Sequence, residues 1–508
     1  HLAMQIAGEM MDGREIQMTL DADIQTMAER AAKRAVRKME GKIDNAAAIV
    51  VDVETAEVLA RVGSADFFNT PGGGQVDICR APRSPGSTLK PFTYGLAMED
   101  NRLYAYETLL DDTWDHGLYH PENFNFKYNG LISASYALRH SLNVPAVAVL
   151  QRIGVENLHG FLRQIGLTTL THSPDHYGLG LTLGSCEVKL EELAAAYCML
   201  ANLGEYRPLR IQKDLPIEKS VRNMSRGICL KLYEMLEQPL PAELHREAMQ
   251  TVSVEPRVCW KTGTSWGLRD AWTFVFNRHY VVGVWMGNND GRSSKRLVGA
   301  GAALPLAGEI FRSLPQKSAP AWPEIGDDLR EVRICAVSGL PASDWCLHTR
   351  KVFLPRTQYL HRLCDMHYPA RKDELNSTDT QTIIERWPAS AQNWDLANIL
   401  SPVTPRTVDH PEQMGRPKDL CVLEPSHESE YILTGELNGD RIRLRTSVDA
   451  QTELHWYVDD RYLGDSEPNR PLYIGLQTGA HRLTCMTQGG ETQTICYRVL
   501  SPEDIACQ

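Results

Sequence analysis

Apolar residues recur at two periods in the first part of the chain, and each period predicts one kind of element. Over residues 23–40 they recur at helical spacing, and Gly41 ends this amphipathic pattern. Residues 46–64 then hold two apolar runs around Glu54 and Thr55, which predicts a β-hairpin. We expect this hairpin to form the edge of a sheet.

The middle of the chain changes period twice. Residues 87–204 are mostly helical in pattern, and "KLEELAAAYCMLANLG" is the clearest helix, with Gly204 as its left-handed C′ residue. Residues 257–287 return to short apolar runs separated by turns, as in neighbouring strands. Strands on both sides of a helical segment predict an α+β domain, with an antiparallel sheet flanked by helices.

The pattern weakens after Ser313, where prolines become frequent in "LPQKSAPAWPEIG" and "ILSPVTPRTVDHPEQMGRPKD". Short strand-like runs return between Cys421 and Leu500 and predict a small β-sandwich. The expected domains are a linker and helix over residues 1–44, a catalytic domain over 45–316, a Pro-rich, cysteine-containing linker over 317–418, and a C-terminal all-β sandwich over 419–508.

Size and charge narrow the range of functions. A chain of 508 residues is too long for one core, which agrees with several domains. With 53 Lys and Arg against 64 Asp and Glu, the net charge is −11, and no basic stripe suggests nucleic acid as a partner. No apolar run reaches the length of a membrane span. The chain begins at His1 without a signal peptide, so we expect any leader, anchor or upstream domain to be missing from it.

Twelve cysteines without a CxxC pair favour an oxidising compartment over a redox enzyme. Cys485 and Cys496 flank the turn at Gly489 and Gly490, which predicts a cross-strand disulfide. Zinc is an alternative use of a second group of residues, although their spacing fits no standard motif: Cys346, His348, His361, Cys364 and His367. Because of the compartment, we expect a disulfide among Cys335, Cys346 and Cys364 instead.

The stretch "SPGSTLK" places a hydroxyl and an amine one helical turn apart. Pro91 lacks an N–H, so little regular helix can precede it, and Ser87 is expected at a helix N-terminus. Lys90 then lies on the same face as Ser87 and can act as its base. Taken alone, the motif is better explained by Ser87 as a helix cap and Lys90 as a solvated side chain of the first turn.

Lys90 must be neutral to accept a proton, which requires burial and a second cation nearby. Lys261 in "KTGTS" is the candidate cation. Gly263 leaves room for an approaching backbone, although a glycine in a strand can also mark a bulge. The hydroxyls of Thr262 and Thr264 could hold a carboxylate beside Lys261.

A third fragment, "RHSLNVPAV", contains Ser141 and Asn143 shortly before Pro145. We expect this proline to move Val144 out of the helical region, which places Ser141 and Asn143 at a helix end. There Ser141 can relay a proton and Asn143 can bind a peptide bond. A plain C-terminal cap is the alternative.

In chain order the fragments read S-x-x-K, S-x-N and K-T-G, the signature of penicillin-recognising serine acyltransferases. Residues 45–315 resemble the transpeptidase domain of class A penicillin-binding proteins, most clearly in "RSPGSTLKPFTYGLAME", "LTLGSCEVKLEELAAAYCMLANLGEY" and "WKTGTSWGLRDAWTFVFN". The tail, with "HWYVDDRYLG" and "GAHRLTC", is similar to the immunoglobulin-like C-terminal domain of the 1C branch. The glycosyltransferase domain and membrane anchor of bifunctional members are not in this sequence. We therefore expect either a fragment or a chain whose accompanying glycosyltransferase activity lies elsewhere.

The resemblance implies a role for each motif residue. Ser87 would be the acylated nucleophile, Lys90 its base, and Ser141 the relay toward the leaving amine. The remaining implied roles are Lys261 holding Lys90 neutral, Asn143, Thr262, Gly263 and Thr264 binding substrate, and the backbone N–H groups of Ser87 and Thr264 forming the oxyanion hole. No metal or organic cofactor is implied.

The implied reaction is attack on the D-Ala-D-Ala bond of a peptidoglycan stem peptide, followed by transfer to an amine, at the periplasmic face of the bacterial inner membrane. The implied ligands are stem peptides and β-lactams. Wall-synthesis proteins are the implied partners of the C-terminal domain. Contact with the membrane is implied only through the missing anchor. Three alternatives stay open: a D,D-carboxypeptidase, a serine β-lactamase and a catalytically silent wall scaffold.

Overall fold

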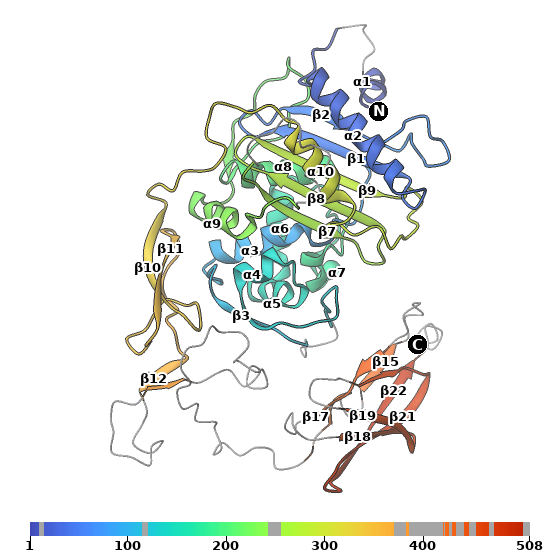
Figure 1. Cartoon of the computed structure of the whole chain (residues 1–508), viewed down its shortest axis with the longest axis vertical. Helices are drawn as coiled ribbons and strands as arrows, with labels where there is room; N and C mark the ends of the chain where they lie inside the picture. Colours follow the sequence, from blue (N-terminus) through green and yellow to red (C-terminus); the bar gives the residue numbers. More distant parts are fainter. Residues whose placement is uncertain are drawn as a thin grey trace. The chain divides into compact units, whose positions relative to one another are not determined.

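The computed structural model describes residues 1–9, 15–113, 120–241, 256–369, 383–385, 420, 422–425, 429–432, 441–446, 454–466 and 472–500. The chain divides into two compact units, His1–Pro402 and Val403–Gln508. Figure 1 shows the helices and strands of both units along the chain. Within the described residues, no helix combines the length and the apolar character needed to cross a membrane.

The first unit is built on a five-stranded antiparallel sheet in the order β2-β1-β9-β8-β7. Its strands are β1 (Asn45–Asp52), β2 (Val58–Val62), β7 (Cys259–Thr264), β8 (Asp270–Phe276) and β9 (Tyr280–Gly287). The hairpin β1–β2 and the meander β7–β8–β9 are as predicted, and β2 is an edge strand. Pairing of β1 with β9 joins the two ends of the domain into one sheet.

Both faces of this sheet are buried, which explains why its strands read as nearly continuous apolar runs. Along β1, Ala46, Ala48 and Val50 pack with helices α2 (Ala22–Lys38) and α10 (Ala303–Arg312). The alternate residues, such as Ile49, belong to a second core with α8 (Leu190–Ala201). Side chains of a strand alternate between faces, so the sheet separates two cores. In Figure 1, α2 and α10 cross the sheet.

In the described residues, further short elements lie before α2, between β2 and β7 and after α10. The remaining helices of the first unit are α1 (Leu2–Glu9), η1 (Gly86–Leu89), α3 (Lys90–Glu99), α4 (Ala134–Arg139), α5 (Asn143–Ile153), α6 (Val155–Gln164), α7 (Pro174–Tyr177), η2 (Gly178–Leu183) and α9 (Arg226–Leu236). Its remaining strands are β3 (Thr108–Asp111), β4 (Gly130–Ser133), β5 (Glu205–Tyr206), β6 (Val221–Arg222), β10 (Leu329–Cys335), β11 (Thr349–Pro355), β12 (His367–Pro369) and β13 (Ile383–Glu385). The arrangement confirms the predicted α+β class.

Three predictions about local structure were wrong. Helix α8 ends at Ala201, and the left-handed C′ residue is Leu203 (φ 55°), with Gly204 one position beyond it. The Leu203 N–H bonds to the Leu200 carbonyl and the Gly204 N–H to the Met199 carbonyl, which is the Schellman pattern. A buried Leu203 side chain offsets the cost of its positive φ.

The second error concerns residues 329–355, for which the sequence predicted an irregular linker. They form the hairpin β10–β11, which pairs in register from Leu329 opposite Pro355 to Cys335 opposite Thr349. The charged residues of "LREVRIC" occupy the open face of this hairpin and hid its alternation. The domain boundaries given above stay a prediction.

The second unit is all β in the described residues. Its strands are β14 (Val422–Glu424), β15 (Ser429–Ile432), β16 (Arg441–Arg443), β17 (Arg445–Thr446), β18 (Leu454–Val458), β19 (Arg461–Ser466), β20 (Tyr473–Gly475), β21 (Gly479–Thr487) and β22 (Thr492–Leu500). A five-stranded sheet, β15-β22-β21-β18-β19, contributes Trp456, Leu483 and Ile495 to a core shared with Val422 and Ile474 from two smaller sheets. This agrees with the predicted β domain.

The disulfide predicted between Cys485 and Cys496 is not formed. Strands β21 and β22 pair Cys485 with Gln493 and Cys496 with Arg482. Cys485 is buried in the core whereas Cys496 is exposed, so the two thiols lie on opposite faces of the sheet. A turn between two cysteines therefore did not place them opposite each other.

Candidate active site

Ser87 lies in the short 3₁₀ turn η1, which leads directly into α3. The Lys90 N–H bonds to the Ser87 carbonyl, and residues three apart eclipse each other in a 3₁₀ turn. Pro91 occupies the first turn of α3, where a missing N–H costs little. The Ser87 side chain is half-buried, whereas the Lys90 side chain is fully buried.

The amine of Lys90 is held by three oxygens. Its Nζ lies 2.6 Å from the Ser141 carbonyl oxygen, 2.9 Å from the Leu142 carbonyl oxygen and 2.7 Å from Asn143 Oδ1. Among the described residues these three are the hydrogen-bond acceptors of Lys90, and the Oγ of Ser87 is not one of them. Three acceptors match the three N–H groups of an ammonium.

The turn that supplies these oxygens joins α4 to α5. Ser141 takes a left-handed conformation (φ 59°), and the Leu142 N–H bonds back to the Ala137 carbonyl. Helix α5 begins at Asn143, so Val144 is helical and Pro145 lies in the first turn. The prediction that Pro145 excludes Val144 from a helix was therefore wrong, because the first turn of a helix tolerates proline.

Lys261 approaches the same turn from β7. Its Nζ lies 2.7 Å from Ser141 Oγ and 2.9 Å from the Thr262 carbonyl oxygen, and its side chain is buried. Ser141 thus contacts both lysines, Lys261 through its hydroxyl and Lys90 through its carbonyl. The structure brings together the three sequence motifs around this one residue.

Burial dominates the electrostatics of the two amines. Burial, and then the charge of Lys261, hold the pKa of Lys90 well below its ordinary value of 10.5, while Asp111 acts in the opposite direction. Burial lowers the pKa of Lys261 to about 7. The three oxygens around Lys90 favour its charged form and counter part of this shift, but they do not replace the water lost on burial.

Three glycines let the Ser87 turn lie against the edge strand β7. A Cβ on Gly263 would stand 2.2 Å from the Pro85 carbonyl oxygen, and one on Gly86 would stand 2.5 Å from the Thr264 carbonyl oxygen. A Cβ on Gly184 would meet the Gly86 nitrogen at 2.4 Å. Because β7 pairs with β8 without a register shift, Gly263 serves close approach and not a bulge.

The backbone of Thr264 points to the open edge of β7. The Ser265 N–H bonds to the Asp270 carbonyl on the β8 side, and successive residues of a strand direct their N–H groups to opposite sides. The Thr264 N–H is therefore directed toward the Ser87 turn. The side chains of Thr262 and Thr264 lie near the loop at Gly299, whose N–H bonds to Thr264 Oγ1 at 3.0 Å.

Sequence reasoning missed a polar network behind Lys90. Asp111, at the end of β3, accepts from Asn123 Nδ2 at 2.7 Å and from Asn129 Nδ2 at 2.6 Å. Asn123 Oδ1 in turn accepts from the Asn143 N–H at 2.8 Å. Asn143 Nδ2 donates to the Glu122 carbonyl oxygen at 2.6 Å, and Asn143 Oδ1 accepts from Lys90. Both polar atoms of the Asn143 amide therefore have hydrogen-bond partners. The several asparagines in "ENFNFKYNG" were the available signal.

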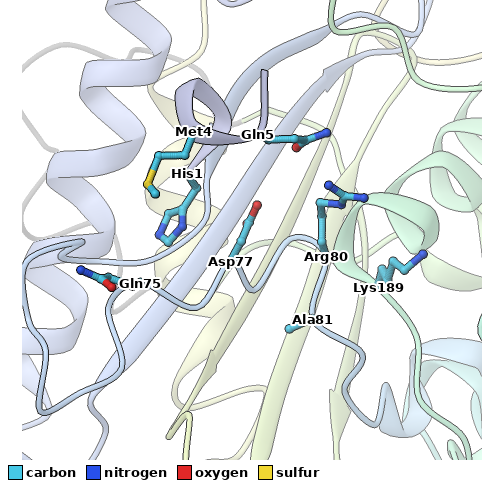
Figure 2. A pocket seen from close by; sticks show the side chains of 8 residues that line it. All are labelled: His1, Met4, Gln5, Gln75, Asp77, Arg80, Ala81 and Lys189. Atoms are coloured by element: carbon cyan, nitrogen blue, oxygen red, sulfur yellow. The ribbon is translucent and has the colours of Figure 1, made fainter. Parts of the chain in front are cut away.

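A cavity of about 730 Å³ lies elsewhere in the first unit. Figure 2 shows the side chains that line it. It lies between α1 and the loop that carries Asp77 and Arg80, and Lys189 borders it. None of its lining residues belongs to the three motifs. The cavity is thus separate from Lys90 and Lys261. The candidate active site is identified by the hydrogen bonds around these two lysines and not by a cavity.

Comparison with known proteins gives this arrangement a family. Residues 46–265 match the model of the penicillin-binding protein transpeptidase domain, and residues 411–499 match the Penicillin-Binding Protein C-terminus Family. Penicillin-binding protein 1C of Escherichia coli is 37% identical over 95% of this chain and 64% of that protein. The chain belongs to the penicillin-binding proteins.

A second relative has a lower sequence identity. Penicillin-binding protein 1A of Aquifex aeolicus is 30% identical over 51% of this chain, which covers 36% of that protein. The chain therefore spans between about a third and two thirds of the length of these relatives.

Solved structures of the family share the fold. Penicillin-binding protein 1A from Haemophilus influenzae has a TM-score of 0.52 at 20% identity over 63% of this chain and 54% of that chain. PonA1 of Mycobacterium tuberculosis in complex with penicillin V has a TM-score of 0.51 at 17% identity over 63% of this chain and 92% of that chain.

The glycine packing yields a first prediction. Gly86 and Gly178 both have positive φ, 54° and 53°, but a Cβ on Gly178 meets nothing within 4 Å. Gly178→Ala should cost only the conformational penalty, roughly 1–3 kcal/mol, because its φ of 53° and ψ of −158° lie in a region that is almost confined to glycine. Gly86→Ala should cost roughly 1–3 kcal/mol more, because the turn must move off β7. Chemical denaturation measures both, and equal losses would contradict the close packing.

Proposed function

We propose that this penicillin-binding protein is a serine D,D-transpeptidase that crosslinks peptidoglycan stem peptides and is acylated by β-lactams at Ser87. The supporting observation is the burial of Lys90, whose backbone N–H bonds to the Ser87 carbonyl and whose amine shares Ser141 as a partner with the second buried amine, that of Lys261. A buried amine with a lowered pKa is the base that a serine nucleophile requires at neutral pH.

The proton inventory of Lys90 suggests how the nucleophile is activated. As an ammonium, Lys90 uses its three N–H groups on three oxygens. When it loses a proton it keeps two donors and gains a lone pair, so one oxygen is released. The lone pair can then accept the Ser87 proton as Ser87 Oγ bonds to the carbonyl carbon of the penultimate D-Ala.

In the proposed acylation, the C–N bond to the terminal D-alanine breaks and its nitrogen receives a proton. Ser141 Oγ lies 2.7 Å from Lys261 Nζ and can relay that proton from the lysine pair. The N–H groups of Ser87 and Thr264 would stabilise the oxyanion. Asn143, Thr262, Gly263 and Thr264 remain the proposed substrate-binding residues.

The second half-reaction would transfer the acyl group to an amine of another stem peptide and regenerate Ser87. We place this activity at the periplasmic face of the bacterial inner membrane, where stem peptides are crosslinked. Wall-synthesis proteins are the proposed partners of the C-terminal β domain.

A β-lactam mass shift tests the nucleophile. Incubation with a penicillin should add one intact penicillin mass to the chain, because ring opening acylates Ser87 without a leaving group. Ser87→Ala should abolish the adduct, whereas Ser173→Ala, at an exposed serine, should leave it unchanged. Intact-mass spectrometry reads all three proteins. An adduct on Ser87→Ala would refute the assignment, and fast turnover of the adduct by wild type would favour a β-lactamase.

The transfer step needs its own measurement. With a stem-peptide donor ending in D-Ala-D-Ala and a second stem peptide carrying a free amine, the chain should release D-alanine and form the crosslinked dimer. Mass spectrometry of the products separates the dimer from the trimmed donor. Trimmed donor alone would favour a carboxypeptidase, and no product despite a penicillin adduct would argue against turnover of this donor.

The pH dependence tests the lysine pair. Because the neutral form of Lys90 is the base, the acylation rate should rise with pH and level off well below 10.5, the ordinary pKa of lysine. Lys261→Met removes a nearby positive charge, so the pKa of Lys90 should rise. The pH range over which the acylation rate increases, the acid limb of the profile, should then move to higher pH. Lys261→Arg keeps a cation and should leave the limb at low pH. Stopped-flow acylation across pH measures these shifts, and coincident limbs for wild type and Lys261→Met would contradict the role of Lys261.

A further inference from the structure

A cluster of soft metal ligands lies in the first unit outside the active site. The Sγ atoms of Cys335, Cys346 and Cys364 and a ring nitrogen of His367 all lie within 4.8 Å of one another. Cys335 ends β10, His367 begins β12, and the other two residues come from the connecting segments. Three of the four residues are buried, and Cys346 is half-buried. The predicted disulfide among these cysteines is not formed.

The spacing of the four atoms fits one tetrahedral ion. His367 Nδ1 lies 3.6 Å from Cys335 Sγ, 3.8 Å from Cys346 Sγ and 3.4 Å from Cys364 Sγ. Zinc bond lengths of about 2.3 Å to sulfur and about 2.0–2.1 Å to nitrogen place these atoms ~3.6 Å apart in a tetrahedron. A disulfide would instead place two of the sulfur atoms about 2.05 Å apart, and the third cysteine would stay outside the bond.

Neighbouring donors point at the sulfurs, as they do around metal-bound thiolates. The N–H groups of Val337 and Ser338 lie 3.4 and 3.5 Å from Cys335 Sγ, and Ser343 Oγ lies 3.3 Å from Cys346 Sγ. Such donors stabilise negative sulfur and orient it. The two N–H groups belong to the turn that follows Cys335, and Ser343 lies further along the connection to β11.

We propose that Cys335, Cys346, Cys364 and His367 bind one structural Zn²⁺. Three thiolates and one imidazole are a closed zinc ligand set without an open position for catalysis. Binding releases the three thiol protons, and the zinc–sulfur bonds protect the thiolates from oxidation. The two histidines that the sequence also offered, His348 and His361, are not in the cluster.

The turn that follows Cys335 is hydrogen-bonded to the start of β3 in the transpeptidase fold. The Thr108 N–H and Oγ1 donate to the carbonyl oxygens of Ser338 and Val337, at 2.8 and 2.7 Å. A Cβ on Gly339 would stand 1.7 Å from the Tyr106 carbonyl oxygen, so the two backbones are in direct contact. The ion would therefore fix the β10–β11 hairpin to the start of β3.

The test uses the full chain produced with zinc and purified without chelator. Elemental analysis should find about one zinc per chain. Cys346→Ser, chosen because Cys346 is only half-buried, and Cys364→Ser should each lose most of the zinc, whereas Cys496→Ser in the other unit should retain it. Zinc content unaffected by both cluster variants would overturn the proposal.

Measurements on the unmodified protein do not depend on how the variants fold. A strong chelator should lower the melting temperature of wild type, and Zn²⁺ but not Mg²⁺ should restore it. Co²⁺ in place of zinc should give thiolate-to-cobalt charge-transfer absorption and tetrahedral visible bands. A zinc-free wild type whose mass is lower by two hydrogens, with a mapped bond among the three cysteines, would establish a disulfide and overturn the proposal.

Discussion

The candidate active site depends on burying two lysine amines, those of Lys90 and Lys261, around one residue, Ser141. Lowering the pKa of a lysine from 10.5 to about 7 corresponds to on the order of 5 kcal/mol for Lys261, and Lys90 is also fully buried. The rest of the fold must offset this cost. The two cores on either side of the sheet supply that stability, and they hold β7 and the α4–α5 turn at fixed positions.

In the α4–α5 turn, backbone carbonyl groups hold one of the two amines. Ser141 adopts a left-handed conformation that costs of order 1 kcal/mol for a residue with a Cβ. In return, its carbonyl and that of Leu142 both point at Lys90 while its hydroxyl meets Lys261. A single strained residue thus positions both amines, and glycine at that position would lack the hydroxyl.

The sequence indicated those parts of the site that lie within short motifs. Ser87 and Lys90 are related by helical spacing, and the need for a neutral Lys90 pointed to a second cation, which Lys261 provides. Asp111 and Asn123 were missed because they act through contacts between loops, and no period in the sequence records such contacts. The Cys335 cluster was misjudged because its ligands are irregularly spaced and converge only after β10 and β11 have paired.

Strand β3 connects the cysteine cluster to the candidate active site by hydrogen bonds of its backbone and side chains. Its first residue, Thr108, is bonded to the turn after Cys335, and its last, Asp111, begins the network that reaches Asn143 and so Lys90. Each link is a hydrogen bond or a close backbone contact. The proposed zinc site therefore acts on Lys90 as a rigid support, because a displaced β3 would remove the amides that hold Asn143 against the amine.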